Sequence, residues 1–489
     1  MRSMRIQNVL CYMVIVLFPA SLLATSILKG VSGPKAVSCE TESQAPASRQ
    51  LPEGPPNRLP DDRFKADILV VVAHPDDETV IAGYLAKAIY DEHRRVGAIF
   101  TTLSEGGGNA VGWEQAAVLG AEREIEARRA LASFGVMNVW FLRGRDNAAQ
   151  DVLYSLESFD HGAMLGKMVR LVRLTRPEVI LTWLPDYVAG ENHGDHQASG
   201  VIATEAFDLA GDPSKFPEQI SAPRDREGIG NLTEGLRPWQ PKKIYYFSDA
   251  DYLVHLHTDF LKGKGPQYAM TVVSPSRKVP YSRLAAEEMS FHLTQGDSGQ
   301  LAKEALAKGD LKFFEPAIHF AFGKSLVGGS STGDIFEGVR PGPVPFAPVS
   351  GYQPESHQGL SVELGGPWAF YRIFWKAHNI EHLAELLPEP EVSVNSGETL
   401  HVPLLIHNDT DAQAQVALFA TLPQGWIAKS GEARYTVAAH DTYPVQTLAV
   451  APTATGEVPR EVTWEAEING KIIGAIKLKV YISMEGMPQ

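Results

Sequence analysis

The chain has 489 residues, which is too long for one ordinary domain, so two or three domains are expected. Hydrophobic residues make up 44% of it and charged residues 21%, proportions typical of a globular protein with a substantial core. The net charge of −14 argues against nucleic acid or an anionic membrane as the main partner. Only two cysteines are present, so no disulfide framework can support the fold.

Residues 1–29 have the pattern of an export signal. Arg2 and Arg5 precede an apolar run at 9–28, and small residues lie toward the end of that run. A run of this length could also span a bilayer, so the segment is predicted to be either a cleaved signal peptide or an N-terminal anchor. Both alternatives predict an exported, extracytoplasmic protein that is periplasmic, secreted or membrane-anchored. Residues 30–62, rich in Pro, Ser and Glu, predict a linker.

Strand and helix patterns alternate through residues 63–250. Candidate strands lie at 66–73, 95–101, 136–142, 178–183 and 243–248. Candidate helices lie at 78–93, 116–134, 161–175 and 195–209. Strands separated by helices of this length predict βαβ units, and therefore an α/β domain with a mostly parallel sheet. The glycine-rich segment 103–113 after the second strand is interpreted as either an active-site lid or a plain linker.

The region 251–387 is interpreted as an extension of this domain, with helices near 281–294 and 299–309. The aromatic stretch Trp368–Trp375 is expected to pack on the α/β domain. His255 and His257 are spaced two apart, as metal ligands on a strand can be. A second metal pair there is not favoured, because no acid or cysteine lies nearby in a suitable register.

The last region, 391–485, follows a proline-rich hinge and has no helical pattern. Its period-two runs lie at 401–407, 415–421, 442–450, 461–467 and 471–481. Short alternating strands over about a hundred residues predict an all-β, immunoglobulin-like sandwich. No catalytic constellation is found in it, so an accessory or structural role is expected. Its turn at 422–426 resembles that of sandwiches appended to secreted glycoside-processing enzymes.

A histidine and three acids follow the first candidate strand directly. The β-branched run 68–72 leads into His-Pro-Asp-Asp-Glu at 74–78, and an amphipathic stretch begins at once. This pattern predicts a buried strand, a tight turn and a helix N-terminus, where open α/β sheets place their chemistry. A helix cap needs only one acid, so the alternative that these three acids serve only to cap the helix N-terminus is less favoured.

The fourth candidate strand, 178–183, leads into a second polar segment, Asn-His-Gly-Asp-His-Gln at 192–197. In a parallel sheet both turns open at the same edge, so the two segments can converge on one cavity. Two neutral imidazoles and one carboxylate form the three-ligand set of a hydrolytic zinc site. A second carboxylate is then needed to take the proton of the water, and a further group to stabilise the oxyanion.

The segments at 73–78 and 193–196 together resemble the PIG-L/LmbE-like family of zinc-dependent deacetylases. These paired motifs are highly specific, and the resemblance spans roughly residues 66–250. Smaller matches are Glu105-Gly106, Arg123 with Glu126, the strand at 243–246 and a helical His-x-x-Gln at 292–295. The resemblance implies a Rossmann-like fold and the removal of acetyl groups from substrates that contain N-acetylglucosamine.

The resemblance also implies roles for individual residues. Zinc would be bound by His74, Asp77 and His196. Asp76 would be the general base that activates the water. His193 would be the protonated residue that stabilises the oxyanion and helps the amine to leave.

Three further residues receive supporting roles from the resemblance. Asp195 would orient a ligand histidine, while Arg123 and Glu105 would contact substrate or brace the metal site. One departure concerns the oxyanion, because some relatives carry a tyrosine two residues before the second motif where this chain has Glu191. Either another residue takes that role, with Tyr187 nearby, or the pocket handles its substrate differently.

The predicted function is zinc-dependent de-N-acetylation of an N-acetylated amino sugar or glycoconjugate. One Zn²⁺ per site is expected, although His/carboxylate sites also accept other divalent metals. One alternative is a zinc amidase acting on another amide, such as a thiol conjugate or an acylated natural product. A second is an inactive carbohydrate-binding surface protein, against which the presence of both Asp76 and His193 argues. No nucleic-acid partner is expected, and membrane contact only through the possible N-terminal anchor.

Overall fold

The computed structural model of the chain describes residues 60–188, 193–220, 235–251, 259–387, 389–430, 433–453 and 456–483. The expected export segment, most of the expected linker, His255, His257 and Glu191 lie outside these ranges. No helix among the described residues is both long enough and apolar enough to cross a bilayer.

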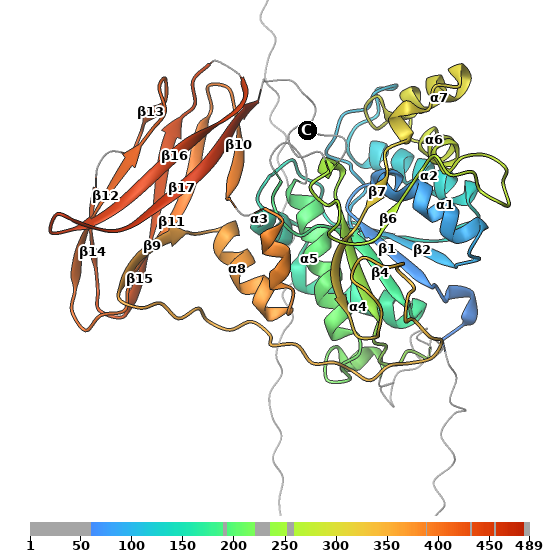
Figure 1. The fold of residues 1–489 in the computed structure, drawn as a ribbon, viewed down its shortest axis with the longest axis horizontal. Helices are drawn as coiled ribbons and strands as arrows, with labels where there is room; N and C mark the ends of the chain where they lie inside the picture. Colours follow the sequence, from blue (N-terminus) through green and yellow to red (C-terminus); the bar gives the residue numbers. More distant parts are fainter. Residues whose placement is uncertain are drawn as a thin grey trace, which may run out of the picture. The chain divides into compact units, whose positions relative to one another are not determined.

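A six-stranded sheet forms the centre of the α/β region (Figure 1). Its strands, in spatial order, are β3 (Asn138–Phe141), β2 (Val96–Phe100), β1 (Ile68–Val72), β4 (Val179–Trp183), β5 (Lys243–Phe247) and β8 (Ala321–Ser325). The first five are parallel, so the predicted mostly parallel sheet is confirmed. The antiparallel edge strand β8 was not predicted, because its short segment lies next to a stretch dominated by glycine and proline.

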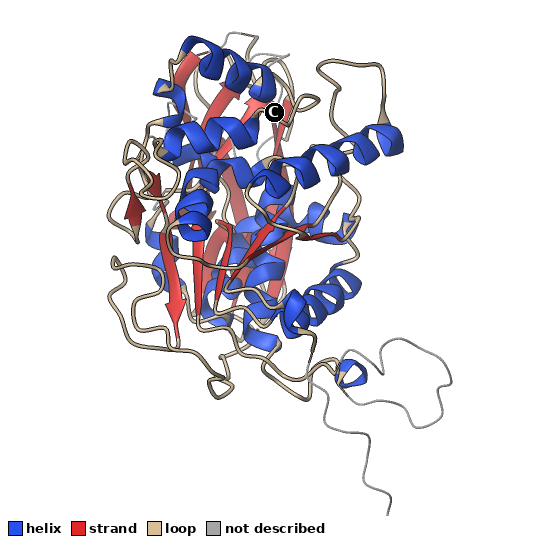
Figure 2. Cartoon of the chain, turned by 90° about the vertical axis from the view of Figure 1, so that its right-hand side faces the viewer, coloured by secondary structure: helices blue, strands red, loops and turns tan. Residues whose placement is uncertain are grey.

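Helices cover both faces of this sheet (Figures 1 and 2). The α-helices among the described residues are α1 (Ala82–Tyr90), α2 (Ala116–Ser133), α3 (Val152–Ser158), α4 (His161–Thr175), α5 (Gly194–Leu209), α6 (Tyr281–Met289), α7 (Ser298–Lys308) and α8 (Pro367–Ala377). Every residue of β1 is buried, because its side chains alternate between two hydrophobic cores. Ile68, Val70 and Val72 belong to one core, whereas Leu69 and Val71 belong to the other.

The order of the strands reverses between β1 and β4. From β1 the chain continues to β2 and β3 on one side, whereas β4 continues to β5 on the other. Ile68 is in register with Val96 of β2 and with Val179 of β4. Loops that diverge in this way leave a crevice at the carboxyl ends of the two central strands. Both polar motifs of the sequence follow these two strands.

The predicted helix at 281–294 is shorter than expected. Helix α6 ends at Met289, and the His-x-x-Gln segment that follows is not helical. The reason is that the backbone N–H groups after α6 have another acceptor. The Glu126 carboxylate on α2 accepts the N–H groups of Leu293 (3.1 Å) and Thr294 (3.2 Å). A side chain distant in sequence therefore replaces the carbonyls that would have continued the helix.

The C-terminal region is rich in strands, as predicted. One sheet contains β10 (Glu391–Asn395), β17 (Lys471–Ser483), β16 (Gly456–Ile468), β12 (Ala414–Thr421) and β14 (Ala433–Val437). The other contains β13 (Ile427–Ala428), β15 (Asp441–Val450), β11 (Thr399–Asn408) and β9 (Leu360–Leu364). Both sheets contribute to one core that includes Leu404, Val416 and Leu478. A small separate pair is formed by β6 (Gln267–Tyr268) and β7 (Ile318–His319).

A strand that precedes the expected hinge pairs with the C-terminal strands. Strand β9 lies within 251–387, yet it pairs with β11 from Leu360↔Asn408 to Leu364↔Leu404. The chain then forms α8, whose Tyr371, Phe374 and Trp375 are buried in the core of the α/β region. Edge pairing by a preceding segment depends on long-range hydrogen bonds, which a local sequence pattern does not indicate.

Candidate active site and metal centre

The first motif forms the turn after β1, and hydrogen bonds to the Asp77 carboxylate hold this turn. The Asp77 Oδ2 atom accepts the backbone N–H groups of Ala73 and His74, both at 2.9 Å, and the indole N–H of Trp183 at 2.6 Å. Burial would raise the pKa of Asp77, but the imidazoles of His196 and His74 outweigh it and hold that pKa well below its usual value. The carboxylate is thus anionic and fixed in orientation, with Oδ1 directed toward two histidines.

The second motif begins helix α5 at the end of the loop after β4. His196 lies in the first turn, and its ring stacks on Trp183 with centroids 4.1 Å apart and an interplanar angle of 9°. Its Nε2 atom is 3.1 Å from His74 Nδ1 and 3.2 Å from Asp77 Oδ1. His74 Nδ1 is 3.6 Å from the same carboxylate oxygen. The structure therefore brings together the three residues predicted as ligands.

These three donor atoms fit a small divalent cation. In a tetrahedral zinc site with metal–ligand bonds of about 2.0–2.1 Å, neighbouring donors lie about 3.3 Å apart. The observed separations of 3.1, 3.2 and 3.6 Å span this value. All three residues are at most 6% exposed, so the donors are desolvated and face one another rather than bulk water. Their roles as ligands stay predictions.

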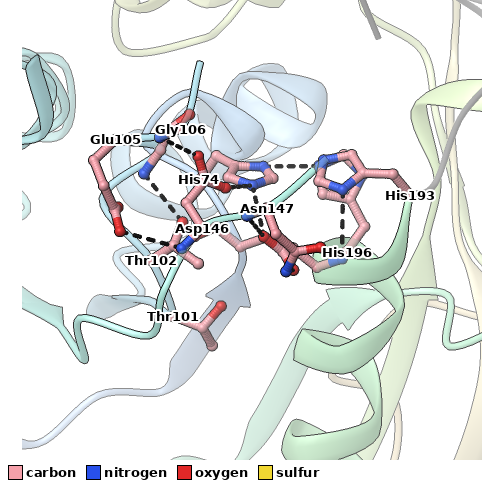
Figure 3. Close-up of polar contacts among 12 residues, drawn as sticks. His74, Thr101, Thr102, Glu105, Gly106, Asp146, Asn147, His193 and His196 are labelled. Carbon is pink, nitrogen blue, oxygen red and sulfur yellow. Dashed lines mark hydrogen bonds and ion pairs between the residues drawn. The ribbon is translucent and has the colours of Figure 1, made fainter. Parts of the chain in front are cut away.

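The second nitrogen of His74 lies near two carboxylates, of which Figure 3 labels Asp146. Its Nε2 atom is 3.0 Å from Asp146 Oδ1 and 3.7 Å from Asp195 Oδ2. A carboxylate that accepts this N–H leaves the lone pair of Nδ1 directed toward the metal centre. Sequence reasoning gave the orienting role to Asp195 and missed Asp146, which is the nearer residue. The position of Asp146 in the loop after β3, at the same edge of the sheet, was the available signal.

Asp195 and Glu105 hold the loop that carries Asp146. Asp195 accepts the backbone N–H of Asn147 at 3.0 Å and its side-chain amide at 2.7 Å. Glu105 accepts the backbone N–H of Asp146 at 3.1 Å, and Gly106 donates its N–H to Asp146 Oδ2 at 2.7 Å. Glu105 thus contacts the loop that carries Asp146, and the two roles expected for it stay predictions.

Arg123 also connects segments of the chain next to the site through hydrogen bonds. Its guanidinium donates to the Ser104 carbonyl and hydroxyl, to the Gly108 carbonyl at 2.7 Å and to the Thr294 carbonyl at 3.1 Å. Nε donates to the Thr294 hydroxyl at 3.4 Å, so all five N–H groups have neutral acceptors. Arg123 therefore links the glycine-rich segment 103–113 to the segment after α6 by hydrogen bonds.

Asp76 has an unusual backbone conformation. Its φ of 134° is in a region that side-chain-bearing residues rarely adopt. The turn is held by the Glu78 carboxylate, which accepts the Asp76 N–H at 3.0 Å, and by the Gln295 amide, which donates to the Pro75 carbonyl. Burial and the neighbouring Asp77 carboxylate raise the pKa of Asp76 to about 7. A carboxylate with such a pKa is suited to general-base chemistry near neutral pH.

His193 lies beside the two histidines predicted as ligands. Its ring centroid is 4.7 Å from that of His74 and 4.2 Å from that of His196. Burial and these two imidazoles lower the pKa of His193 well below its usual value. The protonated state that the resemblance implies for His193 stays a prediction. The hydroxyl of Tyr187, the candidate for the missing tyrosine, accepts the Ser393 N–H of β10 at 2.7 Å.

Comparison with known proteins supports the resemblance inferred from the motifs. Residues 69–207 match the family described as PIG-L: GlcNAc-PI de-N-acetylase. A relative from Catenulispora acidiphila, named 1D-myo-inositol 2-acetamido-2-deoxy-alpha-D-glucopyranoside deacetylase 1, is 32% identical over 31% of this chain and 51% of its own length. The deacetylase of the same name from Geodermatophilus obscurus is also 32% identical, over 31% of this chain and 56% of its own length.

The matched relatives are thus named deacetylases, and the chain spans about half the length of the curated relatives it matches. Among solved structures, N,N'-diacetylchitobiose deacetylase from Pyrococcus horikoshii is 17% identical, with a TM-score of 0.36 over 54% of this chain and 86% of its own.

Proposed function

We propose that this chain is a zinc-dependent hydrolase that removes the acetyl group from an N-acetylated amino sugar of the N-acetylglucosamine type. The observation that supports it most directly is the triangle of donor atoms from His74, Asp77 and His196, with Asp76 beside it. The match of residues 69–207 and the names of the relatives support the same reaction and the same class of substrate.

Each group of the site has a part in this reaction. Zinc held by His74, Asp77 and His196 would polarise the acetamide carbonyl and lower the pKa of a water to about 7. Asp76 takes a proton from the attacking water and returns one to the amine nitrogen as the C–N bond breaks. One acetamide and one water thereby become acetate and a free amine.

His193 can stabilise the oxyanion as a neutral ring. Its Nδ1 atom accepts the backbone N–H of Asp195 at 3.4 Å, so the ring proton is on Nε2. An Nε2–H group can donate to the carbonyl oxygen as negative charge develops there. This role needs no resting positive charge, which agrees with the lowered pKa of His193.

We also propose that the chain is exported and that its C-terminal strands form an immunoglobulin-like sandwich. The basic start and apolar run of residues 1–29 support export, and the two sheets that share a core support the sandwich. The mass of the protein recovered from the extracytoplasmic fraction distinguishes a cleaved signal from a retained anchor.

Acetate release from purified protein tests the proposed reaction. N-acetylglucosaminyl-inositol and N,N'-diacetylchitobiose serve as substrates, beside a thiol-conjugate amide. Asp76→Ala is expected to retain the metal and to lose turnover by about 10²–10⁴-fold, because only the base is removed. His196→Ala is expected to lose both metal and activity.

The exposed Asp62, remote from both motifs, supplies the control Asp62→Asn, which is expected to behave like wild type. Undiminished acetate release by Asp76→Ala would contradict the assigned base. Metal-loaded protein that hydrolyses only the thiol-conjugate amide would replace the proposed substrate class with the first alternative.

A further inference from the structure

A second cluster of ligand-type side chains is buried next to the Asp76 turn. It consists of Glu78, Glu288 and His292, each of which is 0% exposed. Glu78 ends the first motif, Glu288 lies in the last turn of α6, and His292 follows that helix. Two of the three lie beyond residues 69–207, the part that matches the family.

The three side chains point at one another. His292 Nε2 is 3.2 Å from Glu78 Oε1 and 3.9 Å from Glu288 Oε1. One donor atom from each residue lies within 4.8 Å of the other two. The second oxygen of Glu78 is engaged elsewhere, since it accepts the Asp76 N–H at 3.0 Å. Glu78 therefore directs one oxygen to the catalytic turn and the other into the cluster.

Five of the six polar side-chain atoms of the cluster have no partner outside it. Glu78 Oε1, both oxygens of Glu288 and both ring nitrogens of His292 are buried without a hydrogen-bond partner elsewhere among the described residues. Buried polar groups in native proteins are almost always satisfied, and an orphaned group indicates a bound water or ion. Five such atoms within three touching side chains are well beyond the usual number.

The charges of the cluster are also unbalanced. Glu78 and Glu288 place two carboxylates next to the same imidazole with no exposed surface, and burial of two like charges costs free energy unless cations neutralise them. One imidazolium neutralises only one of them. A divalent cation neutralises both, and it accepts lone pairs from both carboxylates and from a neutral imidazole at once.

We propose that Glu78, Glu288 and His292 bind a second divalent metal ion, distinct from the ion of the proposed active site. Two carboxylates and an imidazole are ligands that suit Zn²⁺ or Mn²⁺. Full burial gives this site a structural role, in which the ion joins α6 to the turn that holds Asp76. The inference does not depend on the proposed function, because none of these side chains belongs to the triangle of His74, Asp77 and His196.

Metal content per chain tests this site. Protein purified without added metal is expected to contain two equivalents of divalent metal in the wild type and one in Glu288→Gln. The double variant His74→Ala/His196→Ala is expected to keep one equivalent, because it lacks only the first centre. The control Glu287→Gln changes the adjacent carboxylate of α6, which is half-exposed and pairs with Arg283 at 3.0 Å, and it is expected to keep two.

A Glu288→Gln protein with as much metal as wild type would overturn the proposal, since the cluster would then be a proton-sharing pair of carboxylates. If only the proposed active site fails, the wild type holds one equivalent that is lost in Glu288→Gln and kept in the double variant. Thermal unfolding gives a readout that does not require Glu288→Gln to fold. The Tm of the metal-stripped double variant is expected to rise by several degrees on addition of Zn²⁺ or Mn²⁺, and an unchanged Tm would contradict the site.

Discussion

Trp183 connects the two motifs at the level of single residues. Its indole N–H donates to Asp77 at 2.6 Å, while its ring stacks on His196. The same side chain thereby orients a carboxylate from the first motif and an imidazole from the second. Groups that orient ligands in this way affect metal affinity although they do not touch the metal.

Replacing Trp183 by Phe separates these two contributions. Trp183→Phe keeps an aromatic ring against His196 but removes one of the three N–H donors to Asp77 Oδ2. Zinc affinity, measured by competition with a chromogenic chelator, is expected to fall by about 10–100-fold. Trp140→Phe, on β3 of the same sheet, is the matched control and should bind zinc normally. Equal affinities for the two variants would show that the Trp183 hydrogen bond is dispensable.

At the level of secondary structure, α5 must lie close against the end of β4 to place His196. Gly200 permits this approach, because a Cβ atom there would overlap the carbonyl oxygen of Trp183 and lie 3.1 Å from the backbone nitrogen of Pro185. Backbone atoms cannot move aside as a flexible side chain can. The spacing of α5 and β4 thus depends on a residue without a side chain.

Gly200→Ala is expected to lower the free energy of unfolding by about 1–3 kcal/mol, because overpacking displaces α5. Since His196 lies on the same helix, zinc affinity should fall with it. Urea unfolding and chelator competition measure the two effects. Gly162→Ala on α4, where a Cβ has open space, provides the control and should be neutral or slightly stabilising. A Gly200→Ala protein as stable as wild type would contradict the close approach.

Asp91, at the end of α1, links this helix to the segment before α6. It accepts hydrogen bonds from Tyr281 and Ser274, both at 2.7 Å, and from the Ser276 N–H at 3.0 Å. Burial would raise the pKa of Asp91, but these hydrogen bonds outweigh it and lower that pKa to about 2. A lowered pKa means that the ionised form of Asp91 is more stable in the folded protein than in the unfolded chain.

This stabilisation is present above the unfolded pKa of about 3.9 and is lost as the pH falls through about 2. Asp91→Asn is therefore expected to lower the free energy of unfolding at pH 7, with a difference from wild type that shrinks between pH 4 and pH 2. Chemical denaturation at several pH values measures the difference. The exposed Asp310→Asn serves as the control. A difference that stays constant over this range would rule out the linkage.

At the scale of the whole molecule, α8 connects two hydrophobic cores. Its residues enter the core of the α/β region, where the Tyr371 hydroxyl donates to the Gln197 side chain of α5 at 2.8 Å. The strand just before it, β9, pairs with β11 of the C-terminal region. Arg372 connects α8 to β9, because its guanidinium donates to the Leu364 carbonyl at 2.9 Å and to the Glu363 carboxylate at 2.5 Å.

Truncation of the α8 core residue tests this connection. Phe374 is 0% exposed, so Phe374→Ala is expected to lower the free energy of unfolding by about 3–5 kcal/mol through lost burial and a residual cavity. Lys376→Ala, on the exposed side of α8, should change it by less than about 0.5 kcal/mol. Urea denaturation followed by circular dichroism compares the two variants. Similar stabilities for both would show that α8 contributes little to the core.

The sequence by itself determined the alternation of strands and helices and the meeting of the two motifs. Both follow from local patterns, because apolar periodicity indicates each element and parallel strands place their carboxyl ends at one edge. The two motifs could be assigned to one site for this reason, whereas the choice of His74, Asp77 and His196 as ligands came from the family resemblance.

Only the tertiary structure decided which groups surround those residues. Asp146 rather than Asp195 lies nearest to His74, Trp183 contacts both motifs, and Glu288 with His292 meets Glu78 from some 210 positions away. The pairing of β9 with β11 and the end of α6 at Met289 were also decided only by the tertiary structure. Such contacts depend on strand register and on how helices pack, and those are set by long-range burial and hydrogen bonding that no local pattern records.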